Sequence, residues 1–260
     1  MENADRVRIV LDRTSHPGNI GAAARAMKVM GLTGLHLVRP GRFPHSQATA
    51  LASSADDVLD RARVHDSLHD AIADCTLVLG TSARRRSVAQ EVLDPRAAAV
   101  RALAEPGPVA ILFGTEKSGL DNAALDRCHA LLSIPTGDAY MSLNLAQAVQ
   151  VICYELHLAA RGRVAREQAG PGDPEAASAG GRVAASAGRM EVFFDRLERT
   201  LAAIRFSTPG QTETLHRRLR RLFLRARPDD HELDMLNGIL SRTMRLADND
   251  ERRRTTESDR

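Results

Sequence analysis

The sequence has no tryptophan, two tyrosines and six phenylalanines, so aromatic residues make up 3% of its 260 residues. This scarcity argues against a base-stacking platform of the RRM type. The three cysteines are odd in number and far apart, which predicts reduced thiols and no metal site. No apolar run reaches membrane-spanning length, and the opening MENADRVRIV lacks the basic-then-apolar pattern of a secretory signal. We therefore expect a cytoplasmic protein with no membrane partner.

The length fits one ordinary domain plus a smaller appendage. A formal net charge of +3 is compatible with a nucleic-acid partner but does not require one. A stretch rich in Gly, Ala, Ser and Pro, Gly170–Gly188, indicates a flexible linker. We predict a domain over 1–163, a linker over 164–188, a helical extension over 189–250 and a disordered, charged tail over 251–260.

Strand-like and helix-like segments alternate in the first domain. Five short apolar runs are typical of strands: Val7–Leu11, Leu35–Val38, Thr76–Gly80, Val109–Phe113 and Leu131–Ile134. Helical patterns between and after them cover 19–30, 46–52, 67–73, 95–104 and a long segment from about Ser142 to Ala159. This alternation predicts an α/β fold with a parallel sheet and helices on both faces. Three apolar stripes after residue 189 predict a small module of two or three helices.

The first candidate motif is Gly18-Asn-Ile-Gly21, between a predicted strand and a helix. It lacks the G-x-G-x-x-G pattern, which argues against a nicotinamide site. A purely structural interpretation is also open. In it Gly18 makes the turn, Asn19 caps the helix, Gly21 lets helix and strand approach, and Arg25 is a solvated residue.

The second candidate is Gly114-Thr-Glu-Lys-Ser-Gly119, which follows the strand at Val109–Phe113. It has the glycine spacing of a phosphate loop, but Leu120 and Asp121 stand where Lys and Ser or Thr are needed. Triphosphate chemistry is therefore disfavoured. Glu116 would repel phosphate, yet it could accept hydrogen bonds from a ribose or an amine. Its alternative interpretation is an exposed loop acid.

The third candidate, Ser142-Leu-Asn144, opens the long helix. Ser142 is a good N-cap residue, and the helix is apolar round most of its circumference, so it is predicted to be buried or packed on another subunit. Asn144 is placed to face a ligand bound beside the Gly114 loop. Ligands bind at this kind of position in open α/β sheets, on loops that follow parallel strands.

Two basic segments could contact RNA. Arg84, Arg85 and Arg86 follow a predicted strand at the ligand-facing edge of the sheet. In Leu215–Arg227 leucines occupy one helix face and arginines the other. A solvated face is one explanation, and contact with a polyanion through backbone and shape is the other.

Taken together, His16–Arg25, Phe113–Gly119 and Ile134–Asn144 resemble the three motifs of the SPOUT-class, TrmH-like RNA 2′-O-methyltransferases. The resemblance covers roughly 6–156. The segment Arg217–Pro228 is similar to the C-terminal part of bacterial tRNA methyltransferases of the TrmJ type. In that type an arginine commonly precedes the motif glutamate, where this chain has Thr115.

The resemblance implies a C-terminal trefoil knot, a homodimer and S-adenosyl-L-methionine as methyl donor. It implies methyl transfer to the ribose 2′-hydroxyl of cytidine or uridine 32 in the tRNA anticodon loop. The implied catalytic residues are Asn19, Arg25, Glu116, Ser142 and Asn144. The implied donor-binding residues are Thr81, Ser82, Ala83, Gly114, Ile134, Met141, Ser142 and Leu143. The RNA-binding candidates are Arg84, Arg85, Arg86, Arg217, Arg218, Arg220 and Arg221.

A guanidinium stays protonated at accessible pH, so Arg25 is expected to bind a phosphate and orient the hydroxyl instead of acting as the base. A phosphate oxygen or water would take the proton. Two alternatives remain open: a 2′-O-methyltransferase for another tRNA position or for rRNA, and a non-catalytic RNA-binding dimer. The sequence also leaves open whether cytidine, uridine or both are accepted, and in which tRNAs.

Overall fold

The structure is a computed structural model, and it divides the chain into two compact units, 1–183 and 184–260. Each unit is described by itself. The structure describes residues 6–83, 90–137, 142–168, 183–207 and 211–258, with the backbone alone given for 164–168 and 250–258.

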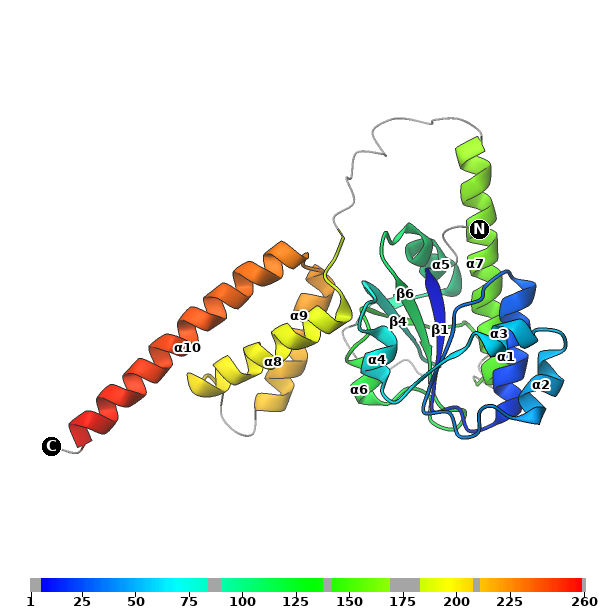
Figure 1. The fold of residues 1–260 in the computed structure, drawn as a ribbon. Helices are drawn as coiled ribbons and strands as arrows, with labels where there is room; N and C mark the ends of the chain where they lie inside the picture. Colours follow the sequence, from blue (N-terminus) through cyan, green and yellow to red (C-terminus); the bar gives the residue numbers. More distant parts are fainter. Residues whose placement is uncertain (1–5, 84–89, 138–141, 169–182, 208–210, 259–260) are drawn as a thin grey trace. The chain divides into compact units, whose positions relative to one another are not determined.

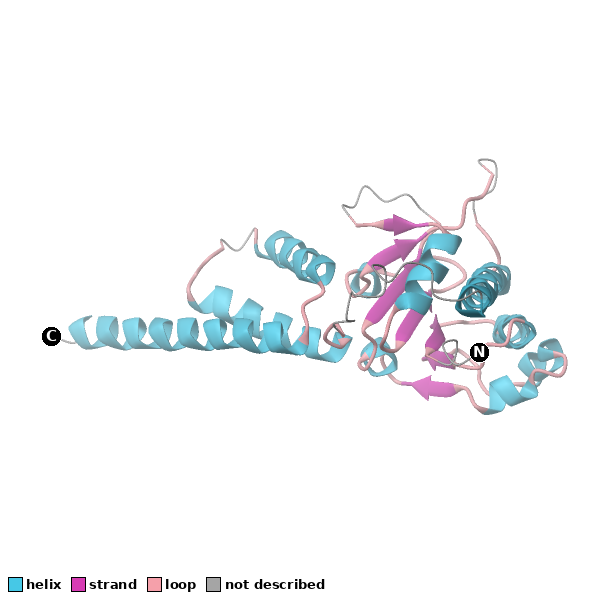
Figure 2. Cartoon of the chain, turned by 90° about the horizontal axis from the view of Figure 1, so that it is seen from above, coloured by secondary structure: helices cyan, strands magenta, loops and turns pink. Residues whose placement is uncertain are grey.

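The first unit is built on a seven-stranded parallel sheet with the strand order β3-β2-β1-β6-β4-β7-β5 (Figures 1 and 2). The strands are β1 (Val7–Asp12), β2 (Leu35–Val38), β3 (Arg63–His65), β4 (Leu77–Thr81), β5 (Val92–Leu93), β6 (Val109–Phe113) and β7 (Ala130–Leu132). The inner strands β1, β4 and β6 are almost wholly buried, because helices cover both faces of a parallel sheet. That explains why they appear in the sequence as continuous apolar runs.

Seven helices accompany these strands in the described part of the first unit. They are α1 (Pro17–Val29), α2 (Ser46–Ala52), α3 (Asp56–Asp60), α4 (Leu68–Ile72), α5 (Pro95–Ala104), α6 (Asn122–Leu125) and α7 (Leu145–Gln168). Alternate residues of β1 show the two layers. Ile9 shares a core cluster with residues of α1, α5 and α7, whereas Arg8 points to the other face and donates to the carbonyl of Ala71 in α4. Figure 1 shows α4 on the opposite side of the strands from α1 and α7.

The strand order reverses beside β1. The chain moves outward from β1 to β2 and β3, then returns to build β4, β6 and β7 on the other side. Ligands of open α/β sheets bind outside the carboxyl ends of the strands at such a switch point. The loops after β1, β6 and β7 are the three segments that carry the candidate motifs.

The predicted α/β class with helices on both faces is confirmed, and the trefoil knot stays a prediction. Two helix starts were predicted wrongly. α1 begins at Pro17 with His16 at the N-cap, so Asn19 lies inside the first turn. α7 begins at Leu145, and Asn144 caps it in place of Ser142, since the Asn144 side chain accepts from the Ala146 N–H at 2.9 Å.

A third correction concerns Gly21. A Cβ at this position would lie 2.0 Å from the Ala48 carbonyl oxygen of α2, so the glycine permits close packing of two helices and not of helix and strand. The elements α3, β3 and β5 were not predicted. Each has at most five residues, too few for a clear periodic pattern.

The described residues of the second unit form three helices, α8 (Ala187–Ala203), α9 (Thr212–Ala226) and α10 (Asp230–Ser258). Its core gathers Phe193 and Phe194 of α8, Leu224 of α9 and Leu233 of α10. The ring of Phe223 meets Phe193 edge-on at 4.8 Å between centroids. The predicted helical extension is therefore present.

The segments predicted to be a linker and a disordered tail overlap with helices of the structure. α7 continues to Gln168 and α8 starts at Ala187, so both ends of the predicted linker 164–188 are helical. Residues 169–182 lie outside the described residues. α10 reaches Ser258, which places most of the segment predicted to be a disordered tail, 251–260, in a helix.

Candidate functional site

The carboxyl group of Glu116, in the loop after β6, accepts four hydrogen bonds from the loop and first turn after β1. One oxygen, Oε1, accepts from Asn19 Nδ2 at 2.9 Å and from the His16 N–H at 3.1 Å. The other, Oε2, accepts from the Ser15 hydroxyl at 3.0 Å and the Ser15 N–H at 3.2 Å. Glu116 thus fixes one motif to another that lies about a hundred residues away in the chain.

These bonds also set the charge of Glu116. Burial by itself would raise the pKa of the carboxyl group. Hydrogen bonds from Asn19 and from the backbone of Ser15 and His16 outweigh it, and the pKa lies below its ordinary value. The carboxylate is therefore ionised at neutral pH and acts as an acceptor only.

The third motif joins through Asn144. Its Nδ2 donates to Asn19 Oδ1 at 3.1 Å, while its Oδ1 caps α7. Asn19 therefore bonds to Glu116 with its nitrogen and to Asn144 with its oxygen. The three segments, remote in sequence, meet in one continuous network.

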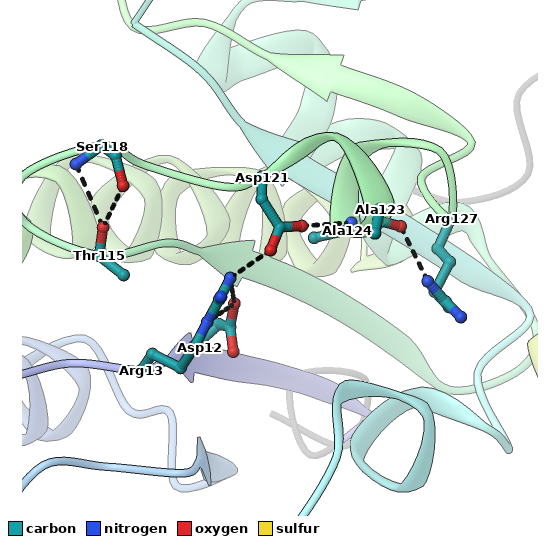
Figure 3. A network of polar contacts seen from close by, with 8 residues as sticks. All are labelled: Asp12, Arg13, Thr115, Ser118, Asp121, Ala123, Ala124 and Arg127. Carbon is teal, nitrogen blue, oxygen red and sulfur yellow. Dashed lines mark hydrogen bonds and ion pairs between the residues drawn. The ribbon is translucent and has the colours of Figure 1, made fainter.

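The loop that carries Glu116 is a tight hairpin. Thr115 and Gly119 form an antiparallel bridge, and the Thr115 hydroxyl contacts the Ser118 hydroxyl at 2.8 Å and accepts from the Ser118 N–H at 3.1 Å (Figure 3). A Cβ at Gly114 would lie 2.0 Å from the Gly119 carbonyl carbon. Only glycine allows the two ends of this hairpin to approach so closely. The phosphate-loop-like glycine spacing therefore has a structural reason here.

A second tie joins the same two loops through Arg13. Its guanidinium lies between two carboxylates, with Nη2 at 2.8 Å from Asp12 Oδ2 and 2.6 Å from Asp121 Oδ2 (Figure 3). Asp121 also caps α6 by accepting from the Ala124 N–H at 2.9 Å. The Gly114–Gly119 hairpin is thus attached to the loop after β1 at two points. Glu116 lies inside the hairpin, and Asp121 lies two residues after it.

Arg25 stands on the exposed side of α1. The residues of α1 that are not buried are Asn19, Ala22, Arg25, Lys28 and Val29. The first four follow one another at three-residue spacing and form one stripe that starts at the network. Arg25 makes no ion pair with any described residue. Ser142 is exposed two residues before Asn144.

The residues predicted to bind the donor come from the end of β4 and from the loops that follow β4, β6 and β7. Thr81 ends β4 and donates its hydroxyl to the Leu112 carbonyl of β6 at 2.8 Å, and the Ser82 N–H donates to the Leu132 carbonyl of β7 at 2.9 Å. These bonds bring the loops after β4, β6 and β7 together. Ala83 and Leu143 are exposed, and Ile134 is half-buried. Met141 lies outside the described residues.

The predicted RNA-binding arginines differ in their surroundings. Arg84, Arg85 and Arg86 lie outside the described residues. Arg218 is exposed and Arg221 is half-buried, while Arg217 pairs with Glu213 one turn earlier at 3.1 Å.

Arg220, by contrast, is engaged within the helical unit, and its predicted contact with RNA stays a prediction. Both of its terminal nitrogens bond to the Glu191 carboxylate of α8, and its guanidinium lies 4.2 Å from the centre of the Phe194 ring. It therefore joins α9 to α8, a role for which guanidinium is suited by its planar fork and its stacking face.

The chain matches two family models. The SpoU rRNA Methylase family covers residues 6–154, and the C-terminal domain of tRNA methyltransferase TrmJ covers residues 188–252. A curated tRNA (cytidine/uridine/adenosine-2′-O-)-methyltransferase TrmJ from Pseudomonas aeruginosa is 45% identical over 249 residues, 94% of this chain and 95% of that protein. The chain belongs to the TrmJ family. This confirms the predicted family and enzyme class.

Further relatives and solved structures also match most of the chain. The tRNA (cytidine/uridine-2′-O-)-methyltransferase TrmJ of Klebsiella pneumoniae is 46% identical over 237 residues, 90% of this chain and 95% of that protein. The crystal structure of TrmJ from Z. mobilis superposes with a TM-score of 0.76 at 33% identity, covering 90% of this chain and 97% of that chain. A probable methylase family protein from Haemophilus influenzae gives 0.62 at 40% identity, covering 94% and 98%.

The sequence singled out Asn19, Glu116 and Asn144, but sequence reasoning missed other residues that tie the loops of this TrmJ-family chain together. Ser15 and His16 contribute backbone N–H groups, which no side-chain pattern reveals. Arg13 and Asp121 pair across 108 positions, and their pairing depends on β1 and β6 being neighbours. Only Asp121 had a visible signal, because an Asp at a helix N-cap can accept a hydrogen bond from the backbone N–H three residues later.

Proposed function

We propose that this protein transfers a methyl group from S-adenosyl-L-methionine to the ribose 2′-hydroxyl of cytidine or uridine 32 in the anticodon loop of tRNA. The observation that carries the proposal is the network in which Asn144, Asn19 and Glu116 join the three motif loops. Membership of the TrmJ family supports the tRNA substrate, and the names of its relatives support methylation at a ribose oxygen of cytidine and uridine.

The loops after β4, β6 and β7 fit a methyl donor with an apolar, flat portion. Exposed Ala83 and Leu143 and half-buried Ile134 offer apolar contacts. When bound there, S-adenosyl-L-methionine supplies an electrophilic methyl carbon on a positively charged sulfur.

The residues of this chain then have to place a ribose oxygen in line with that carbon. Arg25 is exposed on the stripe that begins at Asn19, and its fork suits a phosphate next to the target nucleotide. We assign it the role of binding that phosphate and orienting the sugar. Asn19 and Asn144, which are already held by Glu116 and by the start of α7, give this arrangement a rigid base.

The proton of the 2′-hydroxyl goes to a phosphate oxygen or to water. Glu116 is unsuited to take it, because all four of its bonds are accepted from protein donors and its pKa is lowered. Arg25 is unsuited because a guanidinium does not release its proton at accessible pH.

We also propose that the active form is a cytoplasmic homodimer. Tyr154 and Leu158 are partly exposed at i, i+4 on α7, and Val29 is exposed beside Met30, whose carbonyl contacts His157 of α7. This apolar surface of α1 and α7 supports the assignment. No helix in the described ranges is long and apolar enough to cross a membrane.

The decisive experiment measures methylation of a synthetic anticodon stem-loop by the purified protein, with nucleoside mass spectrometry. Transfer should occur to nucleotide 32 and should vanish when that nucleotide carries a 2′-deoxyribose. Methylation elsewhere, or of ribosomal RNA alone, would overturn the assignment of position or substrate.

Arg25→Lys gives the test of the binding role. We expect it to lower kcat/KM by at least about tenfold, since lysine cannot form the bidentate contact. Lys28→Gln is a matched control on the same helix, because Lys28 is held by Asp57 at 2.6 Å. Near-full turnover of the Arg25→Lys variant at saturating RNA would contradict the role.

A further inference from the structure

The loop between β2 and α2, residues 39–45, carries charge of one sign. Its sequence, Arg-Pro-Gly-Arg-Phe-Pro-His, contains two arginines and a histidine and no acid. It starts directly after Val38, which pairs with Asp12 at the end of β1. The loop therefore lies at the same carboxyl edge of the sheet as the candidate site.

Two contacts fix the loop against the substrate-side motif. The Gly41 N–H donates to the Thr14 carbonyl at 2.9 Å, and a Cβ at Gly41 would lie 3.2 Å from the Ser15 carbonyl oxygen. Phe43 packs against the main core cluster. The loop is thus anchored next to Ser15, one of the residues that hold Glu116.

Its two arginines point to solvent. Arg39 and Arg42 are both exposed, and neither forms an ion pair with any residue in the described part of the chain. Three carboxylates described at this edge of the sheet are already engaged: Glu116 by the Ser15–Asn19 segment, and Asp12 and Asp121 by Arg13. Asp66 is exposed and follows His65, whose carbonyl accepts from the Arg39 N–H at 3.0 Å, but it forms no ion pair with either arginine. Among the described residues, the two guanidinium groups therefore face the solvent beside the site with no ion-pair partner.

We propose that Arg39 and Arg42 form an RNA-contact surface that binds backbone phosphates flanking the methylated nucleotide. The inference rests on the proposed function, because it takes RNA as the ligand. Phosphates are favoured over bases, since the loop exposes guanidinium groups and its one aromatic ring is packed on the core. The surface contributes affinity and register, and it touches none of the reacting atoms.

The test compares two double variants with the same loss of charge. Arg39→Gln with Arg42→Gln removes the proposed surface. Arg61→Gln with Arg63→Gln is the control, because both side chains are exposed. Arg61 stands just before β3 and Arg63 at its start, at the amino ends of the strands and not at the carboxyl ends, where the site lies. The dissociation constant for the tRNA is measured over a range of salt concentrations, and thermal melting shows that both variants are folded.

We expect the loop variant to bind tRNA on the order of 10-fold more weakly at low salt and to reduce the salt slope by about 0.7–0.9 per lost contact. Its kcat at saturating tRNA should stay within about twofold of the unsubstituted protein, and the control should retain the full slope. An unchanged slope, or an equal change in the control, would overturn the inference.

A second measurement locates the contact. Replacing the phosphates on either side of the target nucleotide with neutral methylphosphonates should weaken binding to the unsubstituted protein but not further weaken binding to the loop variant. Fully additive effects would place Arg39 and Arg42 away from those phosphates. If the unsubstituted protein binds tRNA as described but methylates nothing, the proposed function fails while this surface stands.

Discussion

Replacing Glu116 with glutamine is the sharpest test of the network. Glutamine is nearly the same size, but it has one acceptor oxygen in place of two, and its amide nitrogen would face N–H donors of the neighbouring loop. About two of the four hydrogen bonds would be lost. At about 1 kcal/mol for each bond at this solvent-accessible position, the loss is about 2 kcal/mol. If the network serves the transition state, kcat/KM falls about 30-fold.

The assay is the initial rate of methylation with RNA and donor varied separately. Asp74→Asn is the matched control, since it removes a carboxylate that pairs with Arg8 at 2.7 Å, near the start of β1 and away from the site. Both variants should still be folded at the assay temperature, with Glu116→Gln melting about 4–8 °C below the unsubstituted protein. If Glu116→Gln keeps its full rate, or loses no more than the control, the network does not position the reacting groups.

The same residue predicts a pH dependence. Burial raises the pKa of Glu116, but the hydrogen bonds lower it further, to below its ordinary value of 4.5. Because the folded-state pKa is lowered, the carboxylate's contribution to stability is complete above the ordinary pKa of 4.5. This contribution is lost as the pH falls from there through the folded-state pKa. Melting curves of the unsubstituted protein and of Glu116→Gln should therefore converge in acid. A gap that widens below pH 4.5 would contradict this sign.

Two further variants test the architecture. Gly114→Ala should abolish activity and destabilise the first unit by about 3 kcal/mol, because its Cβ would lie 2.0 Å from the Gly119 carbonyl carbon. Gly162→Ala is the control: it has open space around it within α7, so it should keep activity and melt no lower than the unsubstituted protein. Arg220→Ala should lower the free energy of unfolding of the helical unit by about 1–3 kcal/mol, while exposed Arg218→Ala should weaken tRNA binding and leave melting unchanged. Equal melting temperatures for the two arginine variants would refute the distinction.

The sequence predicted the sheet well because a parallel sheet buries both faces of its strands. Leu35–Val38 and Val109–Phe113 were predicted to the residue. Helix starts were less predictable: several polar residues stand near each, and tertiary contacts select one. Asn144 caps α7 while its other side-chain atom bonds to Asn19, and Ser142 has no such partner in the described network.

The residues of the site came from a resemblance, whereas the bonds between them came from the structure. Asn19, Glu116 and Asn144 could be singled out in the sequence, but their mutual distances depend on strand order. The same holds for Arg13 and Asp121, which only the adjacency of β1 and β6 brings together. Local patterns hold no information about such pairs.

The hydrogen bond between Asn19 and Asn144 spans 125 positions, which has a consequence for folding during synthesis. A growing chain on the ribosome can form β1 and α1 early, but the substrate-side loop gains its last partner only after α7 has begun to emerge. Until then the nascent protein lacks a complete binding surface. A chain that stops before Asn144 cannot form this tie, so the network of the three motif loops is completed only after most of the first unit has been made.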